Sequence, residues 1–590
     1  FIRQYLDDIA AVLDEYVMLG THNTLIDRFR AKLTCRLALR IIESNTIPNN
    51  VDDRVDVLVD ELLRALQHPD SSVRYSGAKG IGRVCAKIPP YFAAQVIAAV
   101  LDLMSDNIPG LPQEALSLDS ASHSTTVQDA LDSATIDAVS DSSWNGVLLA
   151  VAELIRRTKI PTNMLGRMFT WVLRALFFEQ QRGLGAIGTN VRDSACYVLW
   201  AAARLPTDSL RPFARPVSAR LGVVMTLDRE VTIRRAASAA FQEWVGRTSL
   251  VPHGIEVLRE ADFSAVGIRR NAYVVCAPRI AAFTFFCVPI HSHLINTCLR
   301  HWDVSVRTFG AKAAAEIAAA HEALLPGAIA AHRAAACSLD SVAVHGVLCA
   351  LAELTQRMYV PDSVRIATSV SPRMFHVPGA SLILAAACEA AAGGLAQEND
   401  EERICQVWNL VEAASRSPET HVHAAVAALV HALRREPNVE SYLGRIDKWN
   451  ALSVEEQRCD ARSLGSLAET HADRIVAHLG RLLVESPDAE VRKNAATSLG
   501  AAGKYVCNER LVQVTNDLVK GLSDFSVDDR GDVGSWVRLA SMRALGAIAT
   551  TCPVSKVALE SICVGMSTQL VERIDVVRVE AAIQLAHIAR

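Results

Sequence analysis

The chain has 590 residues, of which 50% are hydrophobic but only 5% aromatic, and this length is more than one ordinary hydrophobic core supports. Its 60 basic and 64 acidic residues leave a net charge of −4, which excludes the strongly basic surface typical of nucleic-acid-binding proteins. No window reaches the roughly 18 uninterrupted apolar residues of a membrane span. The first residue is Phe1 rather than Met, so we expect the natural start to be missing.

Six segments along the chain share one pattern. Each has an aliphatic residue followed by arginine, often with small residues three and four positions later and an apolar or small residue at seven. The segments are 68–84, 187–203, 229–245, 301–317, 486–502 and 573–589. These offsets lie on one face of a helix. The arginines recur about every 40 residues, as from Arg538 to Arg578, and that period of paired helices predicts an all-α fold, an α-solenoid of HEAT/armadillo-like repeats.

Capping chemistry is expected at the start of the second helix of each pair. In the segment 486–502, Ser486 is predicted as the N-cap, Pro487 as the first helical residue and Asp488 as a first-turn acid. Arg492, four residues on, is placed to pair with an acid of the adjacent repeat. We therefore predict a structural role for the repeated arginines, in stacking one repeat on the next.

Breaks in the pattern suggest four regions. Residues 1–104 and 144–395 are predicted as N-terminal and central HEAT repeats, and residues 396–590 as C-terminal repeats that begin with a short acidic loop at 396–403. Residues 105–143 are rich in Ser, Asp and Thr and lack an apolar face, so they are predicted to be a polar insertion loop with weak helix at best.

Other motifs in the sequence do not indicate a nucleotide, metal or redox site. "GLGAIG" at 183–188 satisfies the glycine spacing of a dinucleotide site, but the stretch before it, 170–182, has the pattern of an amphipathic helix rather than a strand. We therefore expect a loop between helices there. "HSH" at 291–293 and "HVH" at 421–423 have no carboxylate or cysteine partner nearby and are predicted to be surface histidines. The 14 cysteines include no C-x-x-C pair, which favours reduced core residues such as Cys85, Cys196 and Cys349.

Several longer stretches carry a more specific signal. The sequences at 73–89, 142–154, 188–204, 234–247, 251–275 and 301–307, and "DDRGDVGSWVR" at 528–538, resemble segments of the tubulin-folding cofactor D family in the same order. The stretch 311–485 resembles that family only loosely, and members of the family are considerably longer than this chain.

The resemblance implies a chaperone without catalytic, cofactor or metal residues of its own. The family binds β-tubulin, joins it to α-tubulin held by cofactor E and, with cofactor C, stimulates GTP hydrolysis by tubulin; it also takes the α/β-tubulin heterodimer apart and binds an Arf-like small GTPase. No nucleic acid and no membrane span are implied. A cytoplasmic location follows, with association with microtubules or centrosomes open. Two alternatives stay open: another HEAT scaffold, such as a nuclear transport receptor, adaptor or phosphatase subunit, or an enzyme with an unrecognised site.

Candidate partner-binding residues come from the loops of these motifs. Arg530-Gly531-Asp532 would suggest adhesion in an extracellular protein, but in a cytosolic solenoid it is expected to form a turn before a helix that begins near Trp536. Trp536 is predicted to pack beneath this loop, with contact to a partner as the alternative. The candidates are Thr189, Asn190, Arg192, Pro252, His253, Asp528, Arg530, Asp532 and Trp536.

Overall fold

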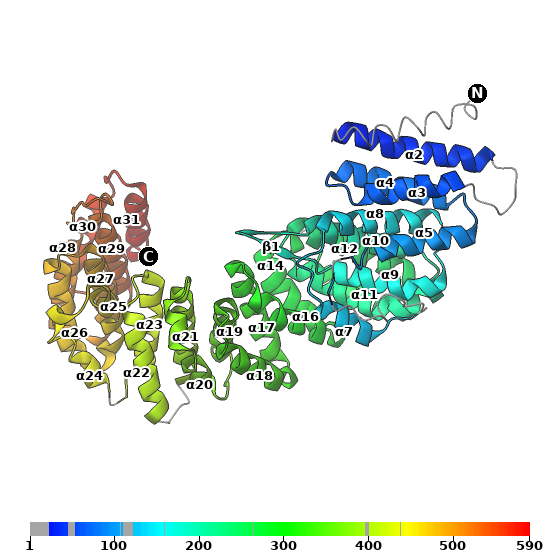
Figure 1. Ribbon diagram of the computed structural model, residues 1–590. Coiled ribbons are helices and arrows are strands. Elements are labelled where there is room, and N and C mark those ends of the chain that lie inside the picture. Colours follow the sequence, from blue (N-terminus) through cyan, green and yellow to red (C-terminus); the bar gives the residue numbers. More distant parts are fainter. Residues whose placement is uncertain are drawn as a thin grey trace. The chain divides into compact units, whose positions relative to one another are not determined.

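The computed structural model describes residues 23–44, 53–106, 108–109, 122–158, 160–262, 265–395, 401–436 and 438–590. Helices account for nearly all of this regular structure (Figure 1). Within these residues the only sheet is a two-stranded antiparallel hairpin, in which β1 (Gln180–Arg182) pairs with β2 (Gly185–Ile187). The predicted all-α fold of helical-pair repeats is therefore confirmed. No helix in the described residues is long and apolar enough to cross a bilayer.

The chain divides into two compact units, residues 1–293 and 294–590. In the first unit one row of helices packs side by side in chain order. This row consists of α2 (Thr24–Ser44), α4 (Ser71–Cys85), α8 (Asp141–Arg157), α10 (Thr189–Ala202) and α12 (Val231–Thr248). A second layer pairs with it and consists of α3 (Asp53–Leu66), α5 (Pro90–Asp102), α9 (Leu165–Ala175) and α11 (Thr207–Leu227). The remaining α-helices of this unit are α7 (Thr125–Ser133), α13 (Gly254–Glu260), α14 (Arg269–Asn271), α15 (Ala277–Ala281) and α16 (Thr284–Asn296), whose last residues cross the boundary.

The second unit repeats the same two-layer arrangement with greater regularity. Its first row consists of α17 (Val304–Ala320), α19 (Ser341–Thr355), α21 (Ala380–Leu395), α23 (Thr420–Ala432), α25 (Val454–Ser463), α27 (Ala489–Ala502), α29 (Gly534–Thr551) and α31 (Asp575–Ile588). The other layer consists of α18 (Leu325–Ala336), α20 (Ser363–Thr368), α22 (Glu401–Ser415), α24 (Val439–Leu443), α26 (Ala468–Glu485), α28 (Asn508–Gly521) and α30 (Lys556–Gln569). Each row helix therefore touches mainly its neighbours in the stack, which is how a solenoid is held together.

Five of the repeated arginines bind the chain in one common way. Each donates from Nη1 to the carbonyl oxygens six and five residues before it, so the loop ahead of the helix wraps around the guanidinium. These are Arg74, Arg234, Arg307, Arg492 and Arg578. Arg192 departs from this pattern and donates to the carbonyl of Phe178 instead, because the residues six and five before it belong to strand β2.

The same guanidinium groups also reach the next repeat. Arg492 Nε donates to Asp524 at 2.7 Å, and Arg192 Nε to Asp228 at 2.7 Å. These two acids confirm the predicted ladder. Elsewhere the acceptor is of another kind: the amide of Asn145 for Arg74, the ring of His345 for Arg307, and the carbonyl of Val266 for Arg234. The arginines of this set are therefore stacking residues, as predicted, but a carboxylate is only one of the partners that they use.

The predicted cap of the helix at 486–502 was misplaced by two residues. Asp488 is the N-cap of α27, and its carboxylate accepts from the backbone amides of Glu490 and Val491. Ser486 and Pro487 lie outside the helix, since their carbonyl groups must turn toward Arg492. Asp70 and Asp303 cap α4 and α17 in the same manner.

The two units share a local duplication. Residues 68–80 (HPDSSVRYSGAKG) correspond to 301–313 (HWDVSVRTFGAKA), and 145–154 (NGVLLAVAEL) to 345–354 (HGVLCALAEL). The contacts agree as well: His68 and His301 each accept from the backbone amide two residues later, at 3.0 Å. Helices α4 and α8 of the first unit thus match α17 and α19 of the second.

Glycine makes the close approach of the matched helices feasible. A Cβ added at Gly146 would lie 1.8 Å from the carbonyl oxygen of Leu66, and one added at Gly346 would lie 1.8 Å from that of Leu299. No side chain fits at such a distance, so both positions require glycine.

The polar insertion is partly ordered, which differs from the prediction of a loop with weak helix at best. Residues 125–133 form α7, and Val127 and Leu131 on that helix are buried. The carbonyl group of Leu131 accepts from Arg174 on α9, and Gln180 of β1 donates to the carbonyl group of Val139. Residue 107 and residues 110–121 of the insertion lie outside the described residues.

Candidate partner-binding surface

Candidate residues from the late motif lie together in the loop between α28 and α29. Asp528 and Gly531 exchange backbone hydrogen bonds of 3.0 and 2.9 Å, which closes a tight turn. Gly531 has a φ of 101° in this turn, a value that favours glycine. The turn therefore forms for the reason predicted from the glycine.

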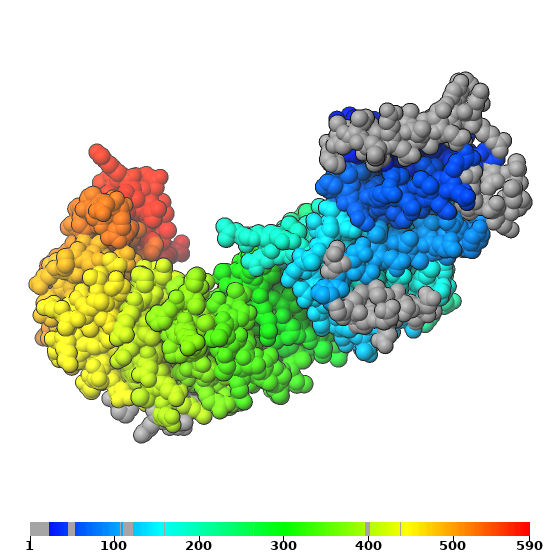
Figure 2. Space-filling model, viewed as in Figure 1, coloured from blue at the N-terminus to red at the C-terminus, as the bar shows by residue number. Residues whose placement is uncertain are grey.

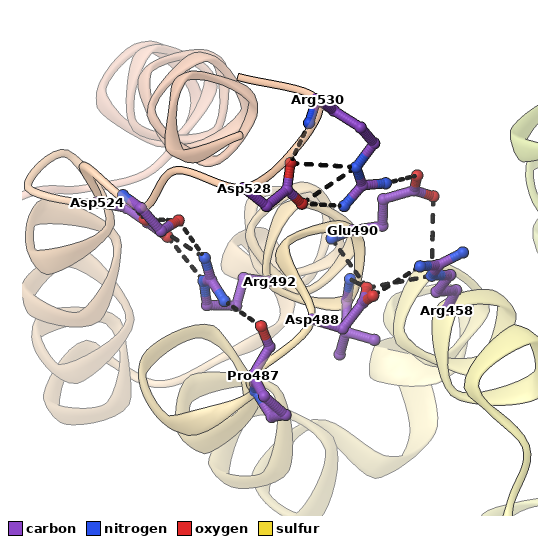
Figure 3. A network of polar contacts seen from close by, with 10 residues as sticks. Arg458, Pro487, Asp488, Glu490, Arg492, Asp524, Asp528 and Arg530 are labelled. Carbon is purple, nitrogen blue, oxygen red and sulfur yellow. Dashed lines mark hydrogen bonds and ion pairs between the residues drawn. The ribbon is translucent and has the colours of Figure 1, made fainter. Parts of the chain in front are cut away.

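Arg530 is the exposed centre of this loop. Its guanidinium donates to the carboxylate of Asp528 at 2.6 Å and lies 3.5 Å from that of Glu490 (Figure 3). It also covers the ring of Trp536, with 5.0 Å to the centroid. Hydrogen bonds from Arg530 hold the pKa of Asp528 below its ordinary value. Trp536 is half-buried and packs beneath the loop as predicted, while it also lines an open cavity.

Asp532 has a structural partner rather than a free carboxylate. It binds Arg538 on α29 at 2.9 Å and accepts from the backbone amide of Ser535 at 2.9 Å. The hydrogen bond from Arg538 is the main reason why the pKa of Asp532 lies below its ordinary value. Arg538 is fully buried, so this acid fixes the start of α29. The exposed side chains of the loop include the charged Asp529 and Arg530 and the apolar Phe525 and Val527.

The candidates of the first unit lie in two places. Thr189 and Asn190 begin α10 directly after the β-hairpin, and the backbone carbonyl of Asn190 accepts from Asn145. Arg192 is buried and its guanidinium binds Asp228 inside the stack, which is the stacking role predicted for the repeated arginines; a contact of Arg192 with a partner stays a prediction. The side chain of Asn190 is exposed.

Pro252 and His253 form the exposed turn before α13. His253 has a φ of 51° and stacks on Phe283 with 5.0 Å between ring centroids. The turn predicted there is confirmed, and Pro252 is exposed to solvent in it. Whether these residues touch a partner stays a prediction.

The hairpin was missed by the sequence interpretation. Helix α9 ends at Ala175, and "GLGAIG" forms the turn and second strand of β1–β2 instead of a loop between helices. Leu184 at its tip is 100% exposed, and the hairpin projects as a knob from the first unit (Figure 2). A strand, β1, does precede the glycines, but it pairs only with β2, in an antiparallel hairpin. A dinucleotide site needs a strand, a helix and a second parallel strand, and the described residues do not form that βαβ unit here.

The histidine pairs do not form a metal centre in the described residues, where no group of three or more candidate ligands occurs. The prediction that they are surface residues is wrong for two of them: His291 and His423 are 6% and 1% exposed. His423 Nε2 bonds the carbonyl group of Ser417 at 2.8 Å, so it plays the part that arginine plays in other repeats. Eight of the 14 cysteines are buried, including Cys85 and Cys196; Cys349 is half-buried.

Two rows of stacked helices, tied repeat to repeat by buried arginines, define a HEAT/armadillo-repeat protein. A family model described as "Tubulin-specific chaperone D-like, ARM repeats" matches residues 34–110 and 114–255. This part of the chain is similar to that family, and the resemblance seen in the sequence is confirmed.

Curated relatives agree with that family. The chain is 36% identical over 252 residues to Tubulin-specific chaperone D of Dictyostelium discoideum, covering 42% of this chain and 15% of that protein. It is 25% identical over 315 residues to Tubulin-folding cofactor D of Schizosaccharomyces pombe, covering 50% of this chain and 27% of that protein. The chain thus spans well under half the length of these relatives.

Among solved structures, importin beta has 14% identity and a TM-score of 0.34, with 99% of this chain and 86% of that chain covered. A superposition of that quality says nothing about function.

Proposed function

We propose that this chain is the tubulin-binding scaffold of a tubulin-folding chaperone. The observation that carries the proposal is the 36% identity to Tubulin-specific chaperone D across 252 residues, together with the match of the family model to residues 34–110 and 114–255. A shared fold alone does not imply a shared function, so the proposal rests on this similarity of sequence rather than on the helical stack.

The architecture suits the task. Unpaired β-tubulin exposes the surface that it will share with α-tubulin, and an obligate interface of that kind buries on the order of 2,000–5,000 Å². Such a patch is prone to aggregation if it is left uncovered. A repeat stack supplies an extended surface without enzymatic machinery, and in this proposal the bound client and its GTP perform the chemistry.

The proposed partners are β-tubulin, the α/β-tubulin heterodimer, cofactors E and C, and an Arf-like small GTPase. Together with the other cofactors the chain would stimulate GTP hydrolysis by tubulin in the cytoplasm and so time release of the heterodimer. Release requires that the assembly bind the two nucleotide states unequally, because a ligand shifts only an equilibrium whose states it binds with different affinity.

The test is size-exclusion chromatography of the purified chain with native tubulin. We expect co-elution at micromolar concentration and a loss of free tubulin dimer as the chain is added in excess. Phosphate release from tubulin should rise only when cofactors C and E are also present. The absence of co-elution would overturn the proposal, and recovery of nuclear-transport cargo or phosphatase subunits in a pull-down would favour the other HEAT scaffolds.

A further inference from the structure

An open cavity of about 800 Å³ lies on the first row of the second unit. Its walls come from α23, α25, α27 and α29. Small residues make room for it, since Ala424, Gly500, Ala540 and Ala544 line the space where larger side chains would fill it. The cavity lies outside the family match at 34–110 and 114–255, and the loop between α28 and α29 does not account for it.

Two cations line the cavity without forming an ion pair among the described residues, although the carboxylate of Glu490 lines it too. Arg462 and Lys493 are both half-buried, and neither forms an ion pair with any carboxylate in the described part of the chain. Their neighbours are paired: Arg458 binds Asp488 at 2.6 Å, and Arg530 binds Asp528 (Figure 3).

Burial lowers the pKa of both side chains, Arg462 and Lys493. A half-buried charge without a partner costs stability. The chain therefore retains two cations where apolar side chains would serve packing better, and this arrangement is what a site for an anion requires.

The rest of the lining fits a peptide. The centroid of the Trp536 ring lies 5.9 Å from the ammonium group of Lys493 and 5.0 Å from the guanidinium carbon of Arg530, so two cations contact this ring. Leu539 adds an apolar surface, and Thr497 and Asn494 add polar groups. Aromatic and aliphatic side chains can hold the apolar stem of an acidic side chain, and the neighbouring cations can bind its carboxylate.

We propose that this cavity binds an extended acidic segment of a partner protein, with a glutamate or aspartate carboxylate between Arg462 and Lys493 and the adjoining chain against Trp536. Charge complementarity favours this occupant. Nucleic acid fits less well, because Glu490 also lines the cavity, Asp488 lies beside it, and the whole chain carries a net charge of −4, whereas a polyphosphate backbone needs a continuous basic track.

Fluorescence anisotropy with a labelled peptide of alternating glutamate and glycine tests the proposal on the full chain. We expect saturable binding, no binding of the matching glutamine–glycine peptide, and a loss of at least about tenfold in affinity for the double variant Arg462→Gln/Lys493→Gln. Lys504 is an exposed lysine that lies just after α27, the helix of Lys493. The variant Lys504→Gln is the matched control and should bind the glutamate peptide as the unaltered chain does.

A second measurement separates binding from folding. Removal of two unpaired, half-buried cations should leave the apparent melting temperature unchanged or raise it, whereas a packing role would lower it. Equal binding of both peptides, or binding that the double variant retains, would overturn the proposal. Competition by inorganic phosphate or by a single-stranded oligonucleotide as effective as that by the glutamate peptide would also overturn it and would assign the cavity to phosphate-bearing ligands. None of these outcomes depends on binding of tubulin.

Discussion

Nε of Arg307 donates a hydrogen bond of 2.9 Å to Nδ1 of His345, in the position where Asn145 accepts from Arg74 in the first unit. The acceptor nitrogen cannot carry a proton, so the imidazole is neutral and its proton lies on Nε2, 3.3 Å from the sulfur of Cys349. Burial and the neighbouring Arg307 lower the pKa of His345 from 6.5 to about 4. A protonated His345 would oppose the stacking of α17 on α19.

Acidification should therefore weaken the second unit. In the unfolded chain His345 takes up a proton as the pH falls through about 6.5, but in the folded chain it resists protonation until about 4. Its contribution to stability is thus complete above pH 6.5 and is lost between 6.5 and 4, by at most about 3 kcal/mol. His345→Asn, which copies the first unit, should reduce the fall in apparent melting temperature between pH 7 and pH 5. If the variant loses as much melting temperature between pH 7 and pH 5 as the unaltered chain, this role of His345 is contradicted. Part of the pH dependence that remains in the variant comes from His478, whose pKa is also lowered to about 4.

Removal of a stacking arginine should cost far more than removal of a surface one. Arg492→Ala leaves Asp524 and two backbone carbonyls without their donor, and breaking a buried pair of this kind costs roughly 3–5 kcal/mol. Arg435→Ala breaks a pair to Glu469 in which the arginine is 75% exposed, and should cost no more than about 0.5 kcal/mol. Urea denaturation of the two variants measures the difference. Similar losses would show that the ladder does not stabilise the stack.

Two glycines in adjacent helices should respond in opposite directions to the same change. Gly346→Ala places a methyl group against the carbonyl of Leu299 and should destabilise the chain by at least about 1–3 kcal/mol. Gly327 on α18 is exposed and has nothing within 4 Å of the added carbon, so Gly327→Ala should stabilise by up to about 1 kcal/mol through helix propensity. Thermal denaturation of both variants is the measurement, and a tolerated Gly346→Ala would mean that α19 can shift.

The cysteines should react according to their burial. Cys337, Cys405 and Cys507 are exposed, whereas burial raises the pKa of Cys85 to about 12. Alkylation of the native chain followed by mass spectrometry should label the first three rapidly and Cys85 only after denaturation. Rapid labelling of Cys85 in native buffer would show that α4 opens locally.

The repeats, their period and the stacking role of arginine could be predicted from sequence, because each depends on residues a few positions apart on one helix. The partner of each arginine in the next repeat could not be predicted, because acid, amide, imidazole and carbonyl groups can all accept from the same guanidinium. The error at Ser486 has the same origin: Ser-Pro-Asp contains two good caps, and the choice depends on which carbonyls Arg492 needs.

The candidate site was predicted only in part. The turn at Gly531 and the packing of Trp536 follow from local sequence, but Arg462 and Lys493 belong to different helices and no spacing links them. The hairpin at 180–187 was missed because alternation over three residues per strand is too short to detect beside a strongly apolar helix.

The duplicated helices also differ in one instructive way. Arg74 and Asn145 are 71 residues apart, but Arg307 and His345 only 38, and the additional 33 residues enter between α5 and α8. The contact between the flanking helices is kept all the same, because each joint involves only adjacent layers. A connector of this kind can accordingly differ in length between repeats while the neighbouring joints keep their geometry.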